Sequence, residues 1–310
     1  MTIVNTNRTF GVEIEFVNTY YGLQELATVL TSALRREFPE QACKFLSWGM
    51  SNENTVSYWK MTTDGSLQQS GGELISPPLP ATPESFRQIE IVTKTLKNMN
   101  SKIDVNCGLH VHHDANDLTV RQLGHIYGTY ASFQTLISSS LAPSRRVNAQ
   151  FMRPEIYHNL PEQNKNAKAW NKPRYNQVKH WANTPALQDL CDMTNKANVR
   201  NNRYHSTVNL QSLAKHGTIE FRQHQGTLNA KKIISWVLVT QAIIERFVQH
   251  KLTWVAPKPD YKTGQWRNFL RTLNVAHSYT KHVDAEQAQV YTNAFSQMKA
   301  NIKRFANQQS

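Results

Sequence analysis

The sequence predicts an α+β fold: a mostly antiparallel sheet with helices packed on one of its faces. Strand and helix patterns follow one another without the regular strand–helix–strand rhythm that is typical of parallel sheets. Several strands alternate polar and apolar residues, so that each has an apolar face able to bury a layer of helices. The 310 residues contain no internal repeat and no clear interdomain linker. We therefore expect a single domain over residues 1–310.

The first half of the chain contains the clearest signals. Pro39 ends the first helical pattern, Pro83 fits the first turn of the second, and the Asp64-Gly65-Ser66 turn precedes a strand that Pro77-Pro78 ends. Alternation predicts strands at residues 9–17, 43–48, 55–61, 73–76 and 109–113. Apolar residues at helical spacing predict helices at residues 23–38, 82–99 and 119–141.

The second half begins with a change of composition. Residues 142–200 are rich in Asn, Lys, Arg and Pro, and we expect them to form an irregular basic insertion. The strand pattern returns at residues 206–210 and 218–223, and a long amphipathic helix follows at residues 229–250. A C-terminal helical extension, residues 251–310, is expected to hold two more helices.

Composition excludes some classes of protein. The most apolar stretch, residues 233–248, contains Gln241, Glu245 and Arg246, and no run reaches the roughly 18–20 apolar residues of a membrane span. Residues 1–8 lack the apolar core of a signal peptide. The three cysteines lie far apart, without the spacing of a disulfide framework or a zinc knuckle. We expect a protein of the reducing cytoplasm with no membrane partner. The sequence does not predict the oligomeric state.

Charge is distributed unevenly along the chain. Residues 1–120 contain 9 Lys/Arg and 13 Asp/Glu, whereas residues 121–310 contain 26 and 9. Five basic residues and no acidic residue occur between positions 165 and 179. Such a basic region attracts anions such as nucleotide phosphates, nucleic acid or an acidic peptide, although a plain solvated surface is an alternative.

Three strands share an unusual polar face. Residues two apart in a strand point the same way, which pairs Glu13 with Glu15, His110 with His112, and Glu220 with Arg222. One such strand alone would indicate a solvated sheet face. Neighbouring carboxylates repel each other unless a cation lies between them, and Mg²⁺ prefers carboxylate oxygens and water. The candidate ligands from chemistry alone are Glu13, Glu15, Glu73 and Glu220, with His110 as a less usual one.

The motifs in these strands resemble those of a known family. Cys107-Gly-Leu-His-Val-His112 is similar to the glycine-x-histidine-x-histidine strand of glutamine synthetase. The ordered set G-x-E-x-E, D-G-S…G-x-E-x-x-S-P, C-G-x-H-V-H, R-Y…N-L and G-T-x-E-F-R…G-T-L-N most closely resembles the putative amidoligase family, over roughly residues 8–250. That family belongs to the glutamine synthetase and glutamate–cysteine ligase superfamily. The resemblance implies a curved sheet, with helices on its outer face, in a glutamine synthetase-like catalytic domain.

The resemblance also implies an activity. The protein would use ATP and Mg²⁺, with Mn²⁺ as an alternative ion, to join small-molecule or peptide carboxylates and amines through an acyl phosphate. Glu13, His110 and Glu220 would hold one metal, and Glu15 and Glu73 another. His112 would face the nucleotide phosphates, while Arg222 and Arg203 would neutralise the transferring phosphoryl group or bind the carboxylate. Asp64 is either a metal ligand or an acid that binds the amine, unless it only bonds its own turn.

Two alternatives remain open at this point. The first is a metal-dependent hydrolase whose zinc ligands are His110, His112, His113 and Asp114. The second is a protein that binds nucleic acid or another polyanion through the basic segment, where aromatic residues are interspersed. The aromatic and basic residues concerned are Trp170, Lys172, Arg174, Tyr175 and Trp181. The sequence has no phosphate-binding loop, so ATP binding follows from the resemblance alone.

Overall fold

The computed structural model divides the chain into two compact units, which are described separately. The sheet unit comprises Asn5–Asp114 and His224–Leu238, and the α3 unit comprises Ala115–Gln223 with Met1–Val4 and Val239–Ser310. The described residues are 7–18, 20–47, 57–65, 67, 71–145, 207–249, 289, 293–294, 296–298 and 300–301. The expectation of one catalytic domain over residues 1–310 stays a prediction.

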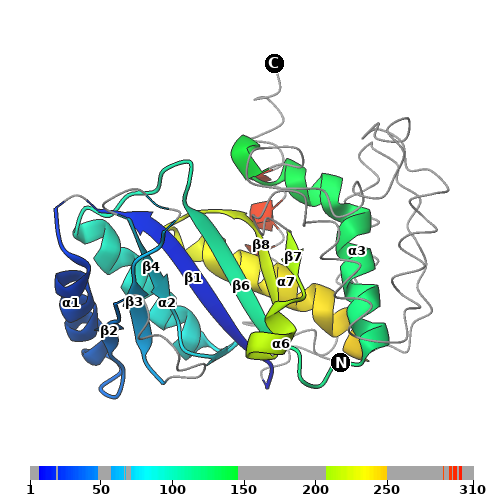
Figure 1. Cartoon of the computed structure of the whole chain (residues 1–310), viewed down its shortest axis with the longest axis horizontal. Helices are drawn as coiled ribbons and strands as arrows, with labels where there is room; N and C mark the ends of the chain where they lie inside the picture. Colours follow the sequence, from blue (N-terminus) through cyan, green and yellow to red (C-terminus); the bar gives the residue numbers. More distant parts are fainter. Residues whose placement is uncertain are drawn as a thin grey trace. The chain divides into compact units, whose positions relative to one another are not determined.

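The sheet unit is built on an open, largely antiparallel sheet, as predicted (Figure 1). Its strands run in the order β2-β3-β4-β1-β6, and β5 pairs with the start of β1. Only the pairing of β2 with β3 is parallel among those of this unit. The strands are β1 (Thr9–Val17), β2 (Cys43–Phe45), β3 (Trp59–Thr62), β4 (Gly71–Ile75), β5 (Leu79–Pro80) and β6 (Gly108–Asp114).

Two helices, α1 (Leu23–Arg35) and α2 (Pro83–Asn98), bury the apolar face of this sheet. Figure 1 shows α2 running behind the strands. Phe10 on β1 stacks on Phe86 of α2 with ring centroids 6.2 Å apart. Trp59 on β3 donates from its indole Nε1 to Gln88 of α2 over 3.1 Å, which satisfies the polar atom of a fully buried ring. Burial of this face leaves the opposite face of the same strands for polar residues.

Local signals explain where α2 begins and ends. Thr82 accepts a hydrogen bond from the amide of Ser85, and Pro83 occupies the first turn, where its missing N–H costs nothing. Beyond the helix, Asn100 adopts φ 59°, a left-handed conformation that asparagine tolerates better than most residues. The predicted range of residues 82–99 is therefore confirmed to within a residue or two.

The α3 unit contains α3 (Val120–Ser139), the 3₁₀ turn η1 (Pro143–Arg145), β7 (Val208–Asn209), α6 (Ser212–His216) and most of β8 (Thr218–Gln225). Thr119 and Gln122 form a capping box at the start of α3. Gly217 ends α6 with φ 66°, which a glycine adopts without strain. Strands β7 and β8 pair antiparallel, with Asn209 opposite Glu220.

Helix α7 (Ala230–Gln249) begins in the sheet unit and continues in the α3 unit, as β8 also passes from one unit to the other. Within the described part of the chain, no helix is long and apolar enough to cross a membrane. The basic insertion predicted at residues 142–200 lies outside the described residues apart from its first four. Most of the predicted C-terminal extension, residues 251–310, also lies outside them.

Candidate active site

The register of β1 against its neighbours gathers the predicted ligands on one face of the sheet unit. Glu13 lies opposite His110 of β6, and Glu15 lies opposite Glu73 of β4. Residues directly opposite each other in an antiparallel pair point to the same face of the sheet. The four side chains therefore share the face that α1 and α2 do not cover.

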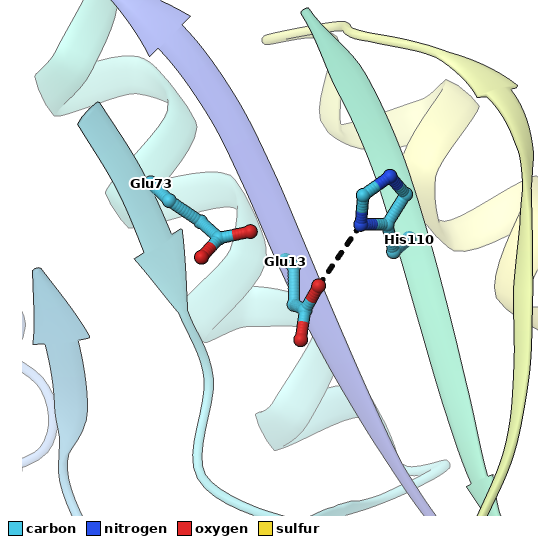
Figure 2. Close-up of side chains that lie close together, drawn as sticks. All are labelled: Glu13, Glu73 and His110. Atoms are coloured by element: carbon cyan, nitrogen blue, oxygen red, sulfur yellow. Dashed lines mark hydrogen bonds and ion pairs between the residues drawn. The ribbon is translucent and has the colours of Figure 1, made fainter. Parts of the chain in front are cut away.

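Two overlapping groups on this face could each hold a cation. Glu13, Glu73 and His110 offer ligand atoms that all lie within 4.8 Å of one another, and Figure 2 shows them converging from three neighbouring strands. Glu15, Asp64 and Glu73 form a second group with the same spacing. Asp64 comes from the loop between β3 and β4, and Glu73 belongs to both groups.

Hydrogen bonds from two histidines orient Glu13. His110 Nδ1 lies 2.9 Å from Glu13 Oε2, and His112 Nε2 lies 3.1 Å from Oε1. Burial raises the pKa of Glu13, but the charge of His112 and hydrogen bonds with both rings outweigh it and hold the pKa well below its ordinary value. The carboxylate is therefore charged at neutral pH and fixed between the rings.

Glu15 is oriented by the backbone of β6. The amide of Gly108 donates to Glu15 Oε2 over 2.5 Å, and only 5% of Glu15 is exposed. A Cβ at position 108 would lie 2.9 Å from His110 Nε2 and 3.4 Å from both carboxylate oxygens of Glu15. Only glycine leaves both side chains where they are. Sequence reasoning gave Gly108 no role, although a glycine inside a strand often marks a close approach.

The α3 unit positions Glu220 and Arg222, the third pair of residues predicted to share a strand face. Arg222 donates from its Nη1 to Glu220 Oε1, and Asn209 of β7 donates to Glu220 Oε2 over 2.7 Å. Glu220 is 4% exposed, so both oxygens are fixed in a buried environment. Asn209 belongs to the R-Y…N-L motif but was assigned no role. Arg203, from the same motif, lies outside the described residues.

Comparison with protein families identifies the chain. The model of a family described as putative amidoligase enzyme matches residues 6–244, a range that contains every site residue described above. The protein belongs to this amidoligase family. The family supports an enzyme with a ligase-type function, and the predicted family is confirmed. No curated protein matches the sequence.

The side chains of this site fit a hard divalent cation. Five of the six members of the two groups, counting Glu73 in each, are carboxylates, and carboxylate oxygen is the ligand that Mg²⁺ prefers. Three carboxylates with oxygens within 4.8 Å of one another repel each other strongly unless positive charge lies between them. Glu13, Glu15, Asp64, Glu73 and His110 are thus a suitable ligand set for one or two such ions.

The alternation of side chains along β6 separates the histidines of the alternative zinc site. His113 pairs with Phe10 on the apolar side of the sheet and is fully buried, whereas His110 and His112 point to the opposite face. Burial, and to a smaller extent the charges of Arg8 and His112, lower the pKa of His113 to about 3. The three rings therefore cannot share one zinc ion, and His113 is a neutral core residue.

Proposed function

We propose that the protein is an ATP-dependent carboxylate–amine ligase with a curved, glutamine synthetase-like catalytic sheet. Its substrates would be small-molecule or peptide carboxylates and amines. The observation that carries the proposal is the convergence of Glu13, Glu15, Glu73 and Asp64 with His110 on the uncovered face of an open antiparallel sheet. Membership of the amidoligase family supports the ligase class, and the carboxylates support a site for metal-bound phosphates.

In this proposal the two groups hold Mg²⁺, with Mn²⁺ as an alternative, and Glu73 serves both. The bound ions would neutralise charge on the transferring phosphoryl group. The position of Asp64 beside Glu15 and Glu73 favours the role of metal ligand over that of an acid for the amine. The family resemblance adds Glu220 to the ligands of the first ion.

The reaction would have two steps. A carboxylate oxygen of the acid attacks the γ-phosphorus of ATP, the bond to ADP breaks, and an acyl phosphate forms. The amine nitrogen then attacks the acyl carbon, phosphate leaves with one of the original carboxylate oxygens, and the nitrogen loses a proton to give the amide. No nucleophilic side chain is needed, so the residues act by positioning and by charge.

Separate residues would perform these tasks. Glu13 holds His112 at 3.1 Å, and the resemblance directs this ring toward the nucleotide phosphates. Arg222 keeps its guanidinium against Glu220, from where it would neutralise the phosphoryl group or bind the acid. Arg203 would share that role.

The oxygen atoms lost from the acid provide the test. The protein is incubated with Mg²⁺-ATP, pooled acids labelled with ¹⁸O in the carboxylate, and pooled amino acids and polyamines. We expect ADP, labelled phosphate and a product lighter than its two substrates by one water, each formed at least about 100-fold more slowly by Glu13→Gln. Stoichiometric AMP would contradict the acyl phosphate mechanism, and labelled phosphate without any amide would indicate a different reaction.

A further inference from the structure

The polar face continues past the carboxylates onto β3 and β2. Lys60 of β3 lies opposite Ile75 of β4, which itself lies opposite Glu13. Lys44 of β2 lies beside Lys60 in the parallel pairing. Lys60 is half-buried and its strand neighbours Trp59 and Met61 are fully buried on the other side, so Lys60 points to the same face as Glu13.

These two cations have no acidic partner among the described residues. Neither Lys44 nor Lys60 lies within ion-pair distance of a carboxylate in the described part of the chain. Lys44 instead places its Nζ 4.0 Å from the centroid of the Tyr58 ring. We call Lys44, Tyr58 and Lys60 the lysine strip. Its positive charge lies near the carboxylates of Glu13, Glu15, Asp64 and Glu73, which we call the acidic group, and forms no ion pair with them.

An apolar side chain separates the strip from the acidic group. Ile75 is only partly buried and lies between Lys60 and Glu13 in the same cross-strand row. Neighbouring strands are spaced about 4.8 Å apart, so Lys60 and Glu13 are roughly 10 Å apart at the backbone. A short aliphatic chain could cross Ile75, with one end near the acidic group and an anionic end at the strip.

We propose that the lysine strip binds a second anionic group of the acid substrate, which is therefore a dicarboxylate or a similar dianion with a short apolar spacer. This inference rests on the proposed function, because the acidic group marks where the other carboxylate reacts. The strip suits the acid better than the nucleotide. By the family resemblance the phosphates lie near His112 of β6, and β6 and β3 are three strand spacings, or about 14 Å, apart.

The experiment measures binding and does not need turnover. Malonate, succinate, glutarate and adipate, each beside its monomethyl ester, are titrated by calorimetry into the Mg²⁺-loaded protein and into Lys60→Met, Lys60→Arg and Lys94→Met variants. Lys94 is an exposed residue of α2 and serves as the matched control. Circular dichroism melts establish that each variant is folded.

We expect at least one dianion to bind the wild type about tenfold tighter than its ester, a difference of ~1.4 kcal/mol. Lys60→Met should lose this preference, whereas Lys60→Arg and Lys94→Met should keep it. The proposal is overturned if no dianion is preferred by the wild type, or if Lys60→Met retains the preference. A competition experiment with the non-hydrolysable ATP analogue AMP-PNP provides a further test. If AMP-PNP displaces the preferred dianion, and if AMP-PNP also binds Lys60→Met more weakly than the wild type, the strip binds the nucleotide and the proposal is overturned. If the proposed ligase reaction is wrong, the labelling experiment above yields no ADP. The calorimetric result does not depend on that outcome and can still be interpreted.

Discussion

Glu13 is the side chain on which the candidate site depends most. It accepts hydrogen bonds from His110 and His112 and also offers a ligand atom to the group shared with Glu73. Each of these roles uses its negative charge, because a carboxylate is a stronger ligand for a cation and a stronger hydrogen-bond acceptor than a neutral amide. Replacement by glutamine keeps the size and one acceptor oxygen but removes the charge.

We therefore expect Glu13→Gln to lower the rate of ATP turnover at least about 100-fold, because a weakly held cation no longer stabilises the charge on the transferring phosphoryl group. The melting temperature should change little, because fewer carboxylates then repel each other. Steady-state ADP release and a thermal melt measure the two effects. Glu220→Gln, which the family resemblance places in the same role, should behave alike. Wild-type turnover by either variant at limiting Mg²⁺ would contradict its assignment as a ligand.

Gly108 provides a second prediction at this scale, on how the ligands are oriented. Alanine at this position would place its Cβ 2.9 Å from His110 Nε2 and would push against Glu15. We expect Gly108→Ala to weaken Mn²⁺ binding about 10–100-fold, the usual effect of disturbing the groups that orient metal ligands. Titration of Mn²⁺ followed by electron paramagnetic resonance measures this directly.

Gly11 offers a matched control for that variant. A Cβ there would meet its nearest side-chain atoms, in His112 and Ser76, at 3.8 Å, which is ordinary contact. Gly11→Ala should therefore bind Mn²⁺ like the wild type. Equal affinities for Gly108→Ala and the wild type would show that the close approach has no functional consequence.

Glu13 and Gly108 also show which site residues can be identified from the sequence alone. Glu13 was identifiable because a carboxylate on a polar strand face has a chemical function of its own. Gly108 was not, because its contribution is an amide and an absent side chain, and both depend on the register of β6 against β1. Lys60 escaped notice for a similar reason: its strand was expected, but its alignment with Glu13 depends on pairings between strands far apart in sequence.

At the scale of elements, the sequence predicted the strands with strict alternation best. The strand at residues 9–17 is confirmed residue for residue, and α7 agrees with its predicted range to within a residue at each end. The strand predicted at residues 73–76 instead begins at Gly71. The two glycines at its start are typical of loops in a sequence, yet both pair with β1 in the sheet. Strand β5 was missed because Pro80, which can pair only where no N–H is needed, normally argues against a strand.

A buried hydrogen-bond network in the α3 unit connects β8 to α3. Gln223 is fully buried, accepts from the Tyr130 hydroxyl over 2.7 Å, and donates to Ser138 and to the carbonyl of Arg145. One amide thus satisfies groups from α3 and from η1. Gln223 directly follows Arg222 in β8, so the two side chains point to opposite sides of the strand. The network therefore holds the strand that presents Arg222.

We expect Gln223→Leu to destabilise the protein by about 2–3 kcal/mol, because it leaves two buried hydroxyls and a buried carbonyl without their partner. Tyr130→Phe removes only one of these bonds and should cost about 1 kcal/mol. Urea unfolding followed by circular dichroism measures both free energies. A smaller loss in the Gln223→Leu variant than in Tyr130→Phe would mean that the amide is not the centre of the network.

For the whole molecule, the uneven charge is the main feature that the described structure leaves unexplained. Residues 1–120 carry an excess of acidic residues and include the acidic group, whereas residues 121–310 carry 26 of the 35 Lys and Arg. The basic segment at residues 145–179, which includes the densest run of basic residues at 165–179, lies almost entirely outside the described residues. Its role stays a prediction from the sequence: it would bind an anionic substrate or the ATP phosphates and so select what the ligase joins.

Charge reversal tests that role. In the variant Lys168→Glu, Lys172→Glu, Arg174→Glu, we expect the apparent KM of an anionic substrate or of ATP to rise more than tenfold, a loss of more than ~1.4 kcal/mol. The melting temperature should hardly change, because exposed charges contribute little to stability. Reversal of Lys94 and Lys97, both exposed on α2, is the control for net charge and should leave KM unchanged. If the triple variant has wild-type kinetics but loses salt-sensitive binding of nucleic acid, the basic segment binds a polyanion that does not take part in the reaction. If neither property changes, the segment is a solvated surface.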